Sequence, residues 1–175
     1  MPTNLEIKAK IADFARTRAL AEALSDTPVE ILVQEDSFFY LPNASQGRLK
    51  LRRFSPSRGE LIFYRRDDCA GPKKCIYDIV STDVPDGVKS MLAHALGVRG
   101  TVHKTRLLYR VGQTRIHLDK VERLGEFLEL EVVLRSDQPE MEGRKIASAL
   151  LERLAVSKED LIERAYIDLL VALPE

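Results

Sequence analysis

The chain has 175 residues, enough for one domain that buries its own hydrophobic core without stabilising metals or disulfides. Lysine and arginine number 27, and aspartate and glutamate also number 27, so the formal net charge is zero. This balance argues against a protein that coats nucleic acid or an acidic membrane through bulk charge. We therefore predict a single domain over residues 1–175 with no nucleic-acid partner.

No apolar run approaches the roughly 20 residues that a membrane-spanning helix needs. The first residues also lack the basic and then apolar order of a signal peptide. Cys69 and Cys75 have no histidine or further cysteine at metal-ligand spacing, and two reduced thiols are favoured over a disulfide. We expect a cytoplasmic protein with no membrane contact.

Alternation of apolar and polar residues predicts eight strands, in chain order at residues 5–11, 29–41, 48–54, 61–66, 73–80, 102–111, 114–121 and 126–134. Helical periodicity follows at 12–24, 87–96, 139–155 and 158–172. Ser157 and Asp160 form a capping-box pattern for the last of these helices. Several connections, such as Gly112-Gln113, are too short for a parallel crossover. The predicted fold class is α+β with an antiparallel sheet.

Charged side chains recur on one face of several strands, because residues two apart in a strand share a face. These rows are Glu6-Lys8-Lys10, Arg48-Lys50-Arg52, Lys104-Arg106-Arg110, Arg115-His117-Asp119 and Phe127-Glu129-Glu131. Basic residues dominate 48–54 and 102–111, whereas carboxylates gather at positions 119, 129 and 131. A face that serves only solubility usually mixes the two signs.

The charged face has two interpretations. An antiparallel sheet often keeps one wet face, and charges there need no function. Eight strands can also close into a barrel, which would turn the charges inward while helices cover the apolar face. Periodicity alone does not choose between the two.

An enclosed charged face would suit a polyphosphate ligand. Arginine offers forked donors and lysine a compact charge for phosphate oxygens. Carboxylates are the hard ligands that Mg²⁺ or Mn²⁺ prefers, and such an ion would bridge phosphate oxygens during attack at phosphorus. No Ser-His-Asp set, P-loop or zinc motif competes with this interpretation.

Short segments found in a fixed order carry a family resemblance. They are Asn4-Leu-Glu-Ile-Lys-Ala-Lys10, Gln34-Glu-Asp-Ser-Phe-Phe-Tyr40, Gly47-Arg-Leu-Lys-Leu-Arg-Arg53, Gly71-Pro-Lys73, Lys104-Thr-Arg106, Arg115-Ile-His-Leu-Asp119, Gly125-Glu-Phe-Leu-Glu-Leu-Glu131 and Tyr166-Ile-Asp-Leu-Leu170. Together they resemble the CYTH superfamily, also called triphosphate tunnel metalloenzymes, over residues 3–170. The likeness is greatest to its class IV adenylyl cyclase branch.

The resemblance implies a closed eight-stranded antiparallel β-barrel, or tunnel, with the charges inside and helices on its flanks. It implies triphosphate binding by Lys8, Lys10, Lys50, Arg52, Arg66, Lys73, Lys104, Arg106, Arg115 and His117. It implies Mg²⁺ or Mn²⁺ as cofactor, held by Glu6, Asp119, Glu129 and Glu131. Catalytic roles are implied for Lys10, Arg52, Glu129 and Glu131.

One position departs from the family's opening signature, Glu-x-Glu-x-Lys. When the signature is placed on Glu6-Ile-Lys8-Ala-Lys10, Lys8 replaces a metal-binding carboxylate. The replacement is either neutral, or it lowers metal affinity and raises anion affinity. His117 also has two interpretations, a phosphate or proton-relay contact and a hydrogen-bonded wall residue.

The resemblance implies a metal-dependent enzyme that converts ATP to cyclic AMP and pyrophosphate. Hydrolysis of tripolyphosphate or of a small organic triphosphate is an alternative, because the same cradle would serve water as the attacking group. A non-catalytic module that binds nucleotide or polyphosphate is a third hypothesis, motivated by Lys8. The likeness is compatible with a homodimer.

Overall fold

The computed structural model describes residues 3–43, 47–66, 68–69 and 71–174. Its strands are Thr3–Lys10 (β1), Glu30–Phe39 (β2), Arg48–Ser55 (β3), Arg58–Arg66 (β4), Lys73–Thr82 (β5), Val98–Val111 (β6), Thr114–Val121 (β7) and Gly125–Val133 (β8). Its helices are Phe14–Leu24 (α1), Pro85–Leu96 (α2), Glu140–Arg153 (α3) and Tyr166–Val171 (α4), with a 3-10 turn at Lys158–Asp160 (η2). None of these described helices is both long and apolar enough to cross a lipid bilayer.

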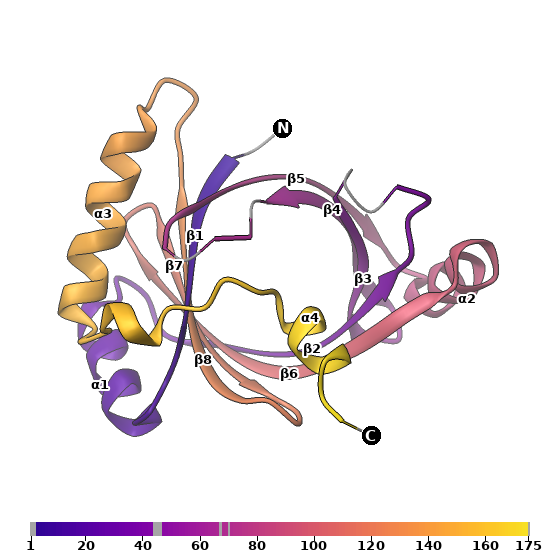
Figure 1. Ribbon diagram of the computed structural model, residues 1–175, viewed down its shortest axis with the longest axis horizontal. Coiled ribbons are helices and arrows are strands. Elements are labelled where there is room, and N and C mark those ends of the chain that lie inside the picture. Colours follow the sequence, from indigo (N-terminus) through magenta and orange to yellow (C-terminus); the bar gives the residue numbers. More distant parts are fainter. Residues whose placement is uncertain (1–2, 44–46, 67, 70, 175) are drawn as a thin grey trace.

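The strands form one closed barrel in the order β1-β5-β4-β3-β2-β6-β7-β8 (Figure 1). Every neighbouring pair is antiparallel, and the pairing of β8 with β1 closes the ring. The predicted fold class, α+β with a closed eight-stranded antiparallel barrel, is confirmed. Closure gives the barrel a distinct inner face and outer face, to which successive side chains of each strand alternate.

Short turns set the register of two predicted hairpins, β3–β4 and β6–β7. In the second hairpin, Val111 pairs with Thr114 across the two-residue turn Gly112-Gln113. Gly112 has a φ of 54°, a left-handed conformation that glycine adopts without a steric penalty. The turn therefore fixes which side chains of β6 and β7 point into the barrel.

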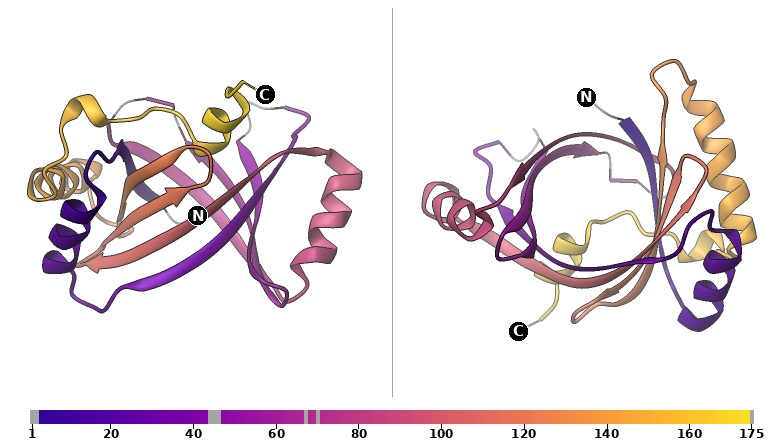
Figure 2. Two further views of the ribbon diagram at one scale, coloured as in Figure 1. Left: turned by 90° about the horizontal axis from the view of Figure 1, so that it is seen from below. Right: turned by 180° about the vertical axis from the view of Figure 1, so that it is seen from behind.

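The apolar outer face of β1, β7 and β8 lies under two helices, α1 and α3 (Figure 2). Ile7, Leu118 and Leu130 have no exposed surface. Gly143 of α3 lets this helix approach closely, since a Cβ there would lie 2.5 Å from a methyl group of Leu134. Because the apolar face of these strands is buried under the helices, their charged face points into the barrel interior.

The prediction of a continuous helix over 158–172 is wrong. Residues 161–165 are not helical, because their backbone bonds β1 instead. The Ile162 amide donates to the Lys8 carbonyl oxygen at 2.8 Å, and Leu161 forms a bridge with Ala9. Ser157 makes no side-chain capping bond to the turn that follows it.

The C-terminal segment closes one end of the barrel. In Figure 1 the chain between α3 and α4 crosses the barrel opening, and α4 lies over it beside β2 and β6. Tyr166 and Ile167 of α4 pack in one cluster with Phe38, Val102 and Phe127 of the barrel. This apolar plug separates the charged interior from one opening.

Candidate active site

The charged rows face the inside of the barrel. A cavity of about 320 Å³ occupies the interior, and Lys50, Arg106 and Glu129 line it together. The predicted site residues that line it are Glu6, Lys8, Lys50, Arg52, Arg66, Lys104, Arg106, Arg115, His117, Glu129 and Glu131. The structure thus selects the inward interpretation of the charged face.

One buried carboxylate on β2 holds three cations on the basic side of this cavity. Asp36 accepts two hydrogen bonds from Arg52, both 2.8 Å long, and one of 2.9 Å from Lys50. The Lys104 ammonium donates to the same carboxylate at 3.4 Å. Because β2 lies between β3 and β6 in the barrel, its inward side chain reaches cations on both neighbours.

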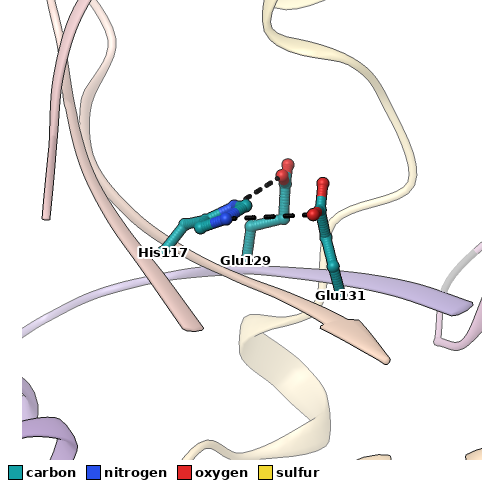
Figure 3. Close-up of side chains that lie close together, drawn as sticks. All are labelled: His117, Glu129 and Glu131. Atoms are coloured by element: carbon teal, nitrogen blue, oxygen red, sulfur yellow. Dashed lines mark hydrogen bonds and ion pairs between the residues drawn. The ribbon is translucent and has the colours of Figure 1, made fainter. Parts of the chain in front are cut away.

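The acidic side combines a histidine of β7 with two glutamates of β8 (Figure 3). His117 Nδ1 lies 3.1 Å from Glu129 Oε1, and its Nε2 lies 3.8 Å from Glu131 Oε2. Lys8 Nζ lies 3.3 Å from Glu129 Oε2, and Arg115 donates to Glu131 at 2.8 Å. One ligand atom from each of His117, Glu129 and Glu131 lies within 4.8 Å of the others.

Arg106 joins the two sides, and its main partner is Asp119. The guanidinium donates two bonds of 2.7 Å to Asp119 and a longer one of 3.3 Å to Glu129. Tyr166 also donates to Asp119, at 2.9 Å, and Asp119 has no exposed surface. Both oxygens of Asp119 thus already have partners, and it is not among the described residues that line the cavity, so its metal role stays a prediction.

Glu6 stands opposite Glu131 in the β1–β8 register but pairs with Arg66 and is not one of the three residues of the acidic group. Arg66 Nη1 donates to Glu6 Oε2 at 2.9 Å, and the arginine side chain is 3% exposed. The Nε and Nη2 groups of Arg66 have no hydrogen-bond partner among the described residues. Buried donors without partners are costly, so these two groups point to a ligand at this wall of the cavity.

The inward row of β1 begins two residues earlier than predicted. Asn4, Glu6 and Lys8 line the cavity, whereas Lys10, at the strand end, is exposed and lies outside the described lining. This corrects the placement of Lys10, which the structure does not bring to the cavity. The signature Glu-x-Glu-x-Lys therefore fits residues 4–8, with Asn4 at its first glutamate and Lys8 as its own lysine.

Lys73 faces inward but serves the C-terminal segment. Its ammonium donates to the carbonyl oxygens of Ile162 and Glu163 at 2.9 and 2.7 Å. Burial, with the nearby charge of Arg66, lowers the pKa of Lys73 to about 8. Lys73 is buried, is not among the described residues that line the cavity and fastens the segment that closes the barrel, so its phosphate role stays a prediction.

Burial and neighbouring charge set the protonation states in the cavity. Burial and the Arg106 charge lower the pKa of Lys104 to about 7, although Asp36 opposes this. Burial alone would raise the pKa of Asp36, but Arg52, Lys104 and Lys50 hold it well below the usual value. Burial and Arg106 lower the pKa of His117, so its imidazole is neutral near pH 7.

The acidic group fits a divalent metal ion. Burial opposes ionisation of Glu129, but Lys8 and Arg106 hold its pKa well below the usual value. Two ionised carboxylates supply the oxygen ligands of Mg²⁺ or Mn²⁺, and a neutral imidazole can add a nitrogen ligand. His117 bonds Glu129 in the acidic group, in line with the wall-residue interpretation, and its phosphate contact stays a prediction. An ion held there competes with Lys8 for Glu129.

The sequence pattern did not identify two side chains that line the cavity, Asp36 and Tyr166. Asp36 shares a face with Gln34 and Phe38 in one of the family segments, and a lone charge in that row was its signal. Tyr166 lies under Lys8, whose ammonium is 3.8 Å from the ring centroid. Helical periodicity could not predict this contact, because it does not show which distant strand a helix packs against.

Comparisons with known proteins agree with this geometry. The CYTH domain model matches residues 2–166. Adenylate cyclase CyaB of Aeromonas hydrophila is 29% identical over 170 residues, which cover 93% of this chain and 86% of that protein. The solved PH1012 protein of Pyrococcus horikoshii OT3 is 26% identical with a TM-score of 0.83, covering 95% of this chain and 98% of that one. A conserved hypothetical protein of Pyrococcus furiosus has a TM-score of 0.75 at 22% identity, covering 95% and 99%. Because the domain match spans nearly the whole sequence, this chain belongs to the CYTH domain family.

Proposed function

We propose that the chain binds a triphosphate inside the barrel and acts on it with a divalent metal ion, as an adenylyl cyclase of the class IV type. The observation that carries this proposal is one cavity in which the Lys50, Arg52 and Lys104 cluster shares an enclosed space with His117, Glu129 and Glu131. The similarity to CyaB of Aeromonas hydrophila supports cyclisation of ATP as the reaction.

The basic side of the cavity has donors left for phosphate oxygens. Each lysine ammonium carries three donors, and both Lys50 and Lys104 give one to Asp36. Arg66 adds two buried nitrogen donors, Nε and Nη2, that make no hydrogen bond within the described part of the chain, although Nη2 lies 3.8 Å from Asp68 Oδ1. These groups would bind and orient the phosphates before reaction.

The cations and the acidic group have separate parts in cyclisation. The ribose 3′ oxygen forms a bond to the α-phosphorus and gives its proton to solvent water, while the bond from that phosphorus to the pyrophosphate oxygen breaks and pyrophosphate leaves. Glu129, Glu131 and His117 would hold Mg²⁺ or Mn²⁺, which supplies positive charge to the phosphate oxygens. Lys50, Arg52 and Lys104 would stabilise the negative charge that grows on the departing pyrophosphate.

Apolar side chains in the cavity wall favour a substrate with an organic group. Leu32, Phe54, Ile79 and Leu108 line the cavity from four different strands. The Arg58 guanidinium lies 4.4 Å from the centroid of the Phe54 ring, which adds a flat surface. A nucleoside can pack against such groups, whereas tripolyphosphate cannot. This observation favours ATP over tripolyphosphate as substrate.

Incubation of the purified protein with Mg²⁺ or Mn²⁺ and either ATP or tripolyphosphate tests the proposal. Cyclic AMP and pyrophosphate from ATP are the expected products. Release of orthophosphate from either compound would mean that the protein is a hydrolase. Tight binding of both compounds without turnover would mean that it is a binding module.

A matched pair of variants on β8 assigns any turnover to the cavity. Glu129→Ala/Glu131→Ala should abolish it, because both inward carboxylates are lost. Glu126→Ala removes an outward glutamate that pairs with Lys120 and should retain it. Equal turnover in both variants would show that another site, or a contaminant, performs the reaction.

A further inference from the structure

The contacts of Asp36 suggest a function beyond neutralising charge. Its carboxylate is 1% exposed and touches three cations that come from two different strands. Arg52 uses Nε and Nη2 for this contact, and each lysine uses one of its three donors. Within the described residues, most donors of the three side chains therefore stay free for a second anion.

Without a carboxylate between them, the three cations would repel one another. Like charges a few ångström apart in a buried site favour neutral or displaced side chains. Lys104 is the most sensitive of the three. The Arg52 guanidinium stays charged near neutral pH, and the Lys104 side chain is 3% exposed against 13% for Lys50. The groups that act on it from the surrounding elements are Asp36 of β2, Arg52 of β3, Arg106 of β6, Asp119 of β7 and the Tyr166 ring of α4. Lys50 of β3 shares the Asp36 Oδ2 atom with it.

We propose that Asp36 is a positioning residue for triphosphate binding, whose single carboxylate gathers Lys50, Arg52 and Lys104 into one charged cluster that faces the cavity. The inference rests on the proposed function only in naming a triphosphate as the anion. Asp36 contacts the three cations from β2, in the barrel wall. The phosphate oxygens of the substrate would accept hydrogen bonds from the donors of Lys50, Arg52 and Lys104 that remain.

This proposal predicts the opposite sign from simple charge counting. Removal of a negative charge from an anion site should strengthen anion binding if Asp36 is only a competing charge. If Asp36 positions the cluster, its removal separates the cations and lets Lys104 lose its proton, so binding weakens. The sign of one affinity change therefore separates the two possibilities.

The test is calorimetric titration of tripolyphosphate, without metal, into the wild-type protein and Asp36→Asn. We expect the dissociation constant of the variant to rise at least about fivefold near pH 8 and less near pH 6, where Lys104 keeps its proton. Asp36→Glu, which retains the charge but displaces it, should lie between the two. Glu60→Gln removes another carboxylate of the cavity wall, opposite Arg52 in register, and should bind as well as wild type or more tightly.

A titration of Lys104 by NMR, with no anion present, keeps the test independent of the proposed function. Its pKa should fall below the wild-type value of about 7 in Asp36→Asn. An unchanged Lys104 pKa, or tighter tripolyphosphate binding by folded Asp36→Asn near pH 8, would overturn the positioning role. If Asp36→Asn does not fold, affinity of Asp36→Glu equal to wild type overturns it instead. If wild type binds no triphosphate but the Lys104 pKa falls as expected, the proposed function fails and the positioning of the cluster stands.

Discussion

Lys8 and Tyr166 meet at the closed end of the barrel, where the lysine ammonium lies 3.8 Å from the centroid of the aromatic ring. The Tyr166 hydroxyl donates to Asp119, and its ring packs on Phe127 with centroids 5.0 Å apart. One side chain of α4 therefore contacts a cation of β1, a carboxylate of β7 and an apolar ring of β8. The C-terminal segment is thereby part of the site that it covers.

Substitution of Tyr166 should separate its two contacts. Tyr166→Phe removes the hydroxyl only, and we expect unfolding free energy to fall by about 1–3 kcal/mol, the scale of a hydrogen bond to a charged group. Tyr166→Leu also removes the ring, which should cost about 1 kcal/mol more through lost cation–π and aromatic packing. Urea unfolding measures both values. Equal unfolding free energies of the two variants would show that the cation–π contact with Lys8 does not stabilise the fold.

Lys73 should control the stability of the covering segment. Lys73→Met leaves the carbonyl oxygens of Ile162 and Glu163 without their buried donor, at a cost of about 1–3 kcal/mol. We expect faster hydrogen exchange at the Ile162 amide, which bonds the Lys8 carbonyl in the same segment. Lys74→Met, at the exposed neighbouring position, is the control and should exchange like wild type. Equal exchange rates in the two variants would contradict the fastening role.

Arg52 and Arg53 are adjacent residues that point to opposite faces of β3. Arg52→Ala should weaken triphosphate binding by about 1–3 kcal/mol, because a charge-assisted contact is lost in a buried site. Arg53 pairs with Asp86 on the outside of the barrel, so Arg53→Ala should leave the affinity unchanged. Calorimetry with a non-hydrolysable ATP analogue provides the measurement. A similar loss in both variants would place the ligand outside the barrel.

Triphosphate affinity should depend on pH through Lys104. Its pKa of about 7 means that the free protein loses this charge as pH rises, while a bound anion favours the protonated form. The affinity therefore falls above about pH 7, by up to about tenfold per pH unit from this one group. Lys104→Arg keeps its charge over this range.

The difference between wild type and Lys104→Arg isolates the contribution of Lys104, because the phosphate groups titrate equally in both experiments. Titrations between about pH 6 and pH 9 should show a steeper loss of affinity for wild type. Parallel pH profiles would mean that Lys104 does not face the bound anion.

Strand alternation predicted the barrel strands well because inward side chains recur at every second position, whether the outward face lies under helices or, as at Ile31 and Val33 of β2, is exposed. The same periodicity failed at residues 161–165, where the helical pattern persists but β1 supplies the backbone partners. It also extended the charged row of β1 to Lys10, since alternation continues past the point where the cavity ends. A one-dimensional pattern records the face of a residue but not its depth in the barrel.

The amino-acid order alone predicted an antiparallel α+β chain in which cations dominate residues 48–54 and 102–111 and carboxylates gather at positions 119, 129 and 131, because the period of a strand assigns each side chain to a face. Closure of the barrel places this charged face in the interior. The order of strands around the barrel then determines which charged side chains pair with one another. Asp36 came to hold Lys50, Arg52 and Lys104, while Asp119 was committed to Arg106 and Lys73 to the C-terminal segment. These pairings depend on which strands lie side by side, and that relation arises only when distant parts of the chain meet.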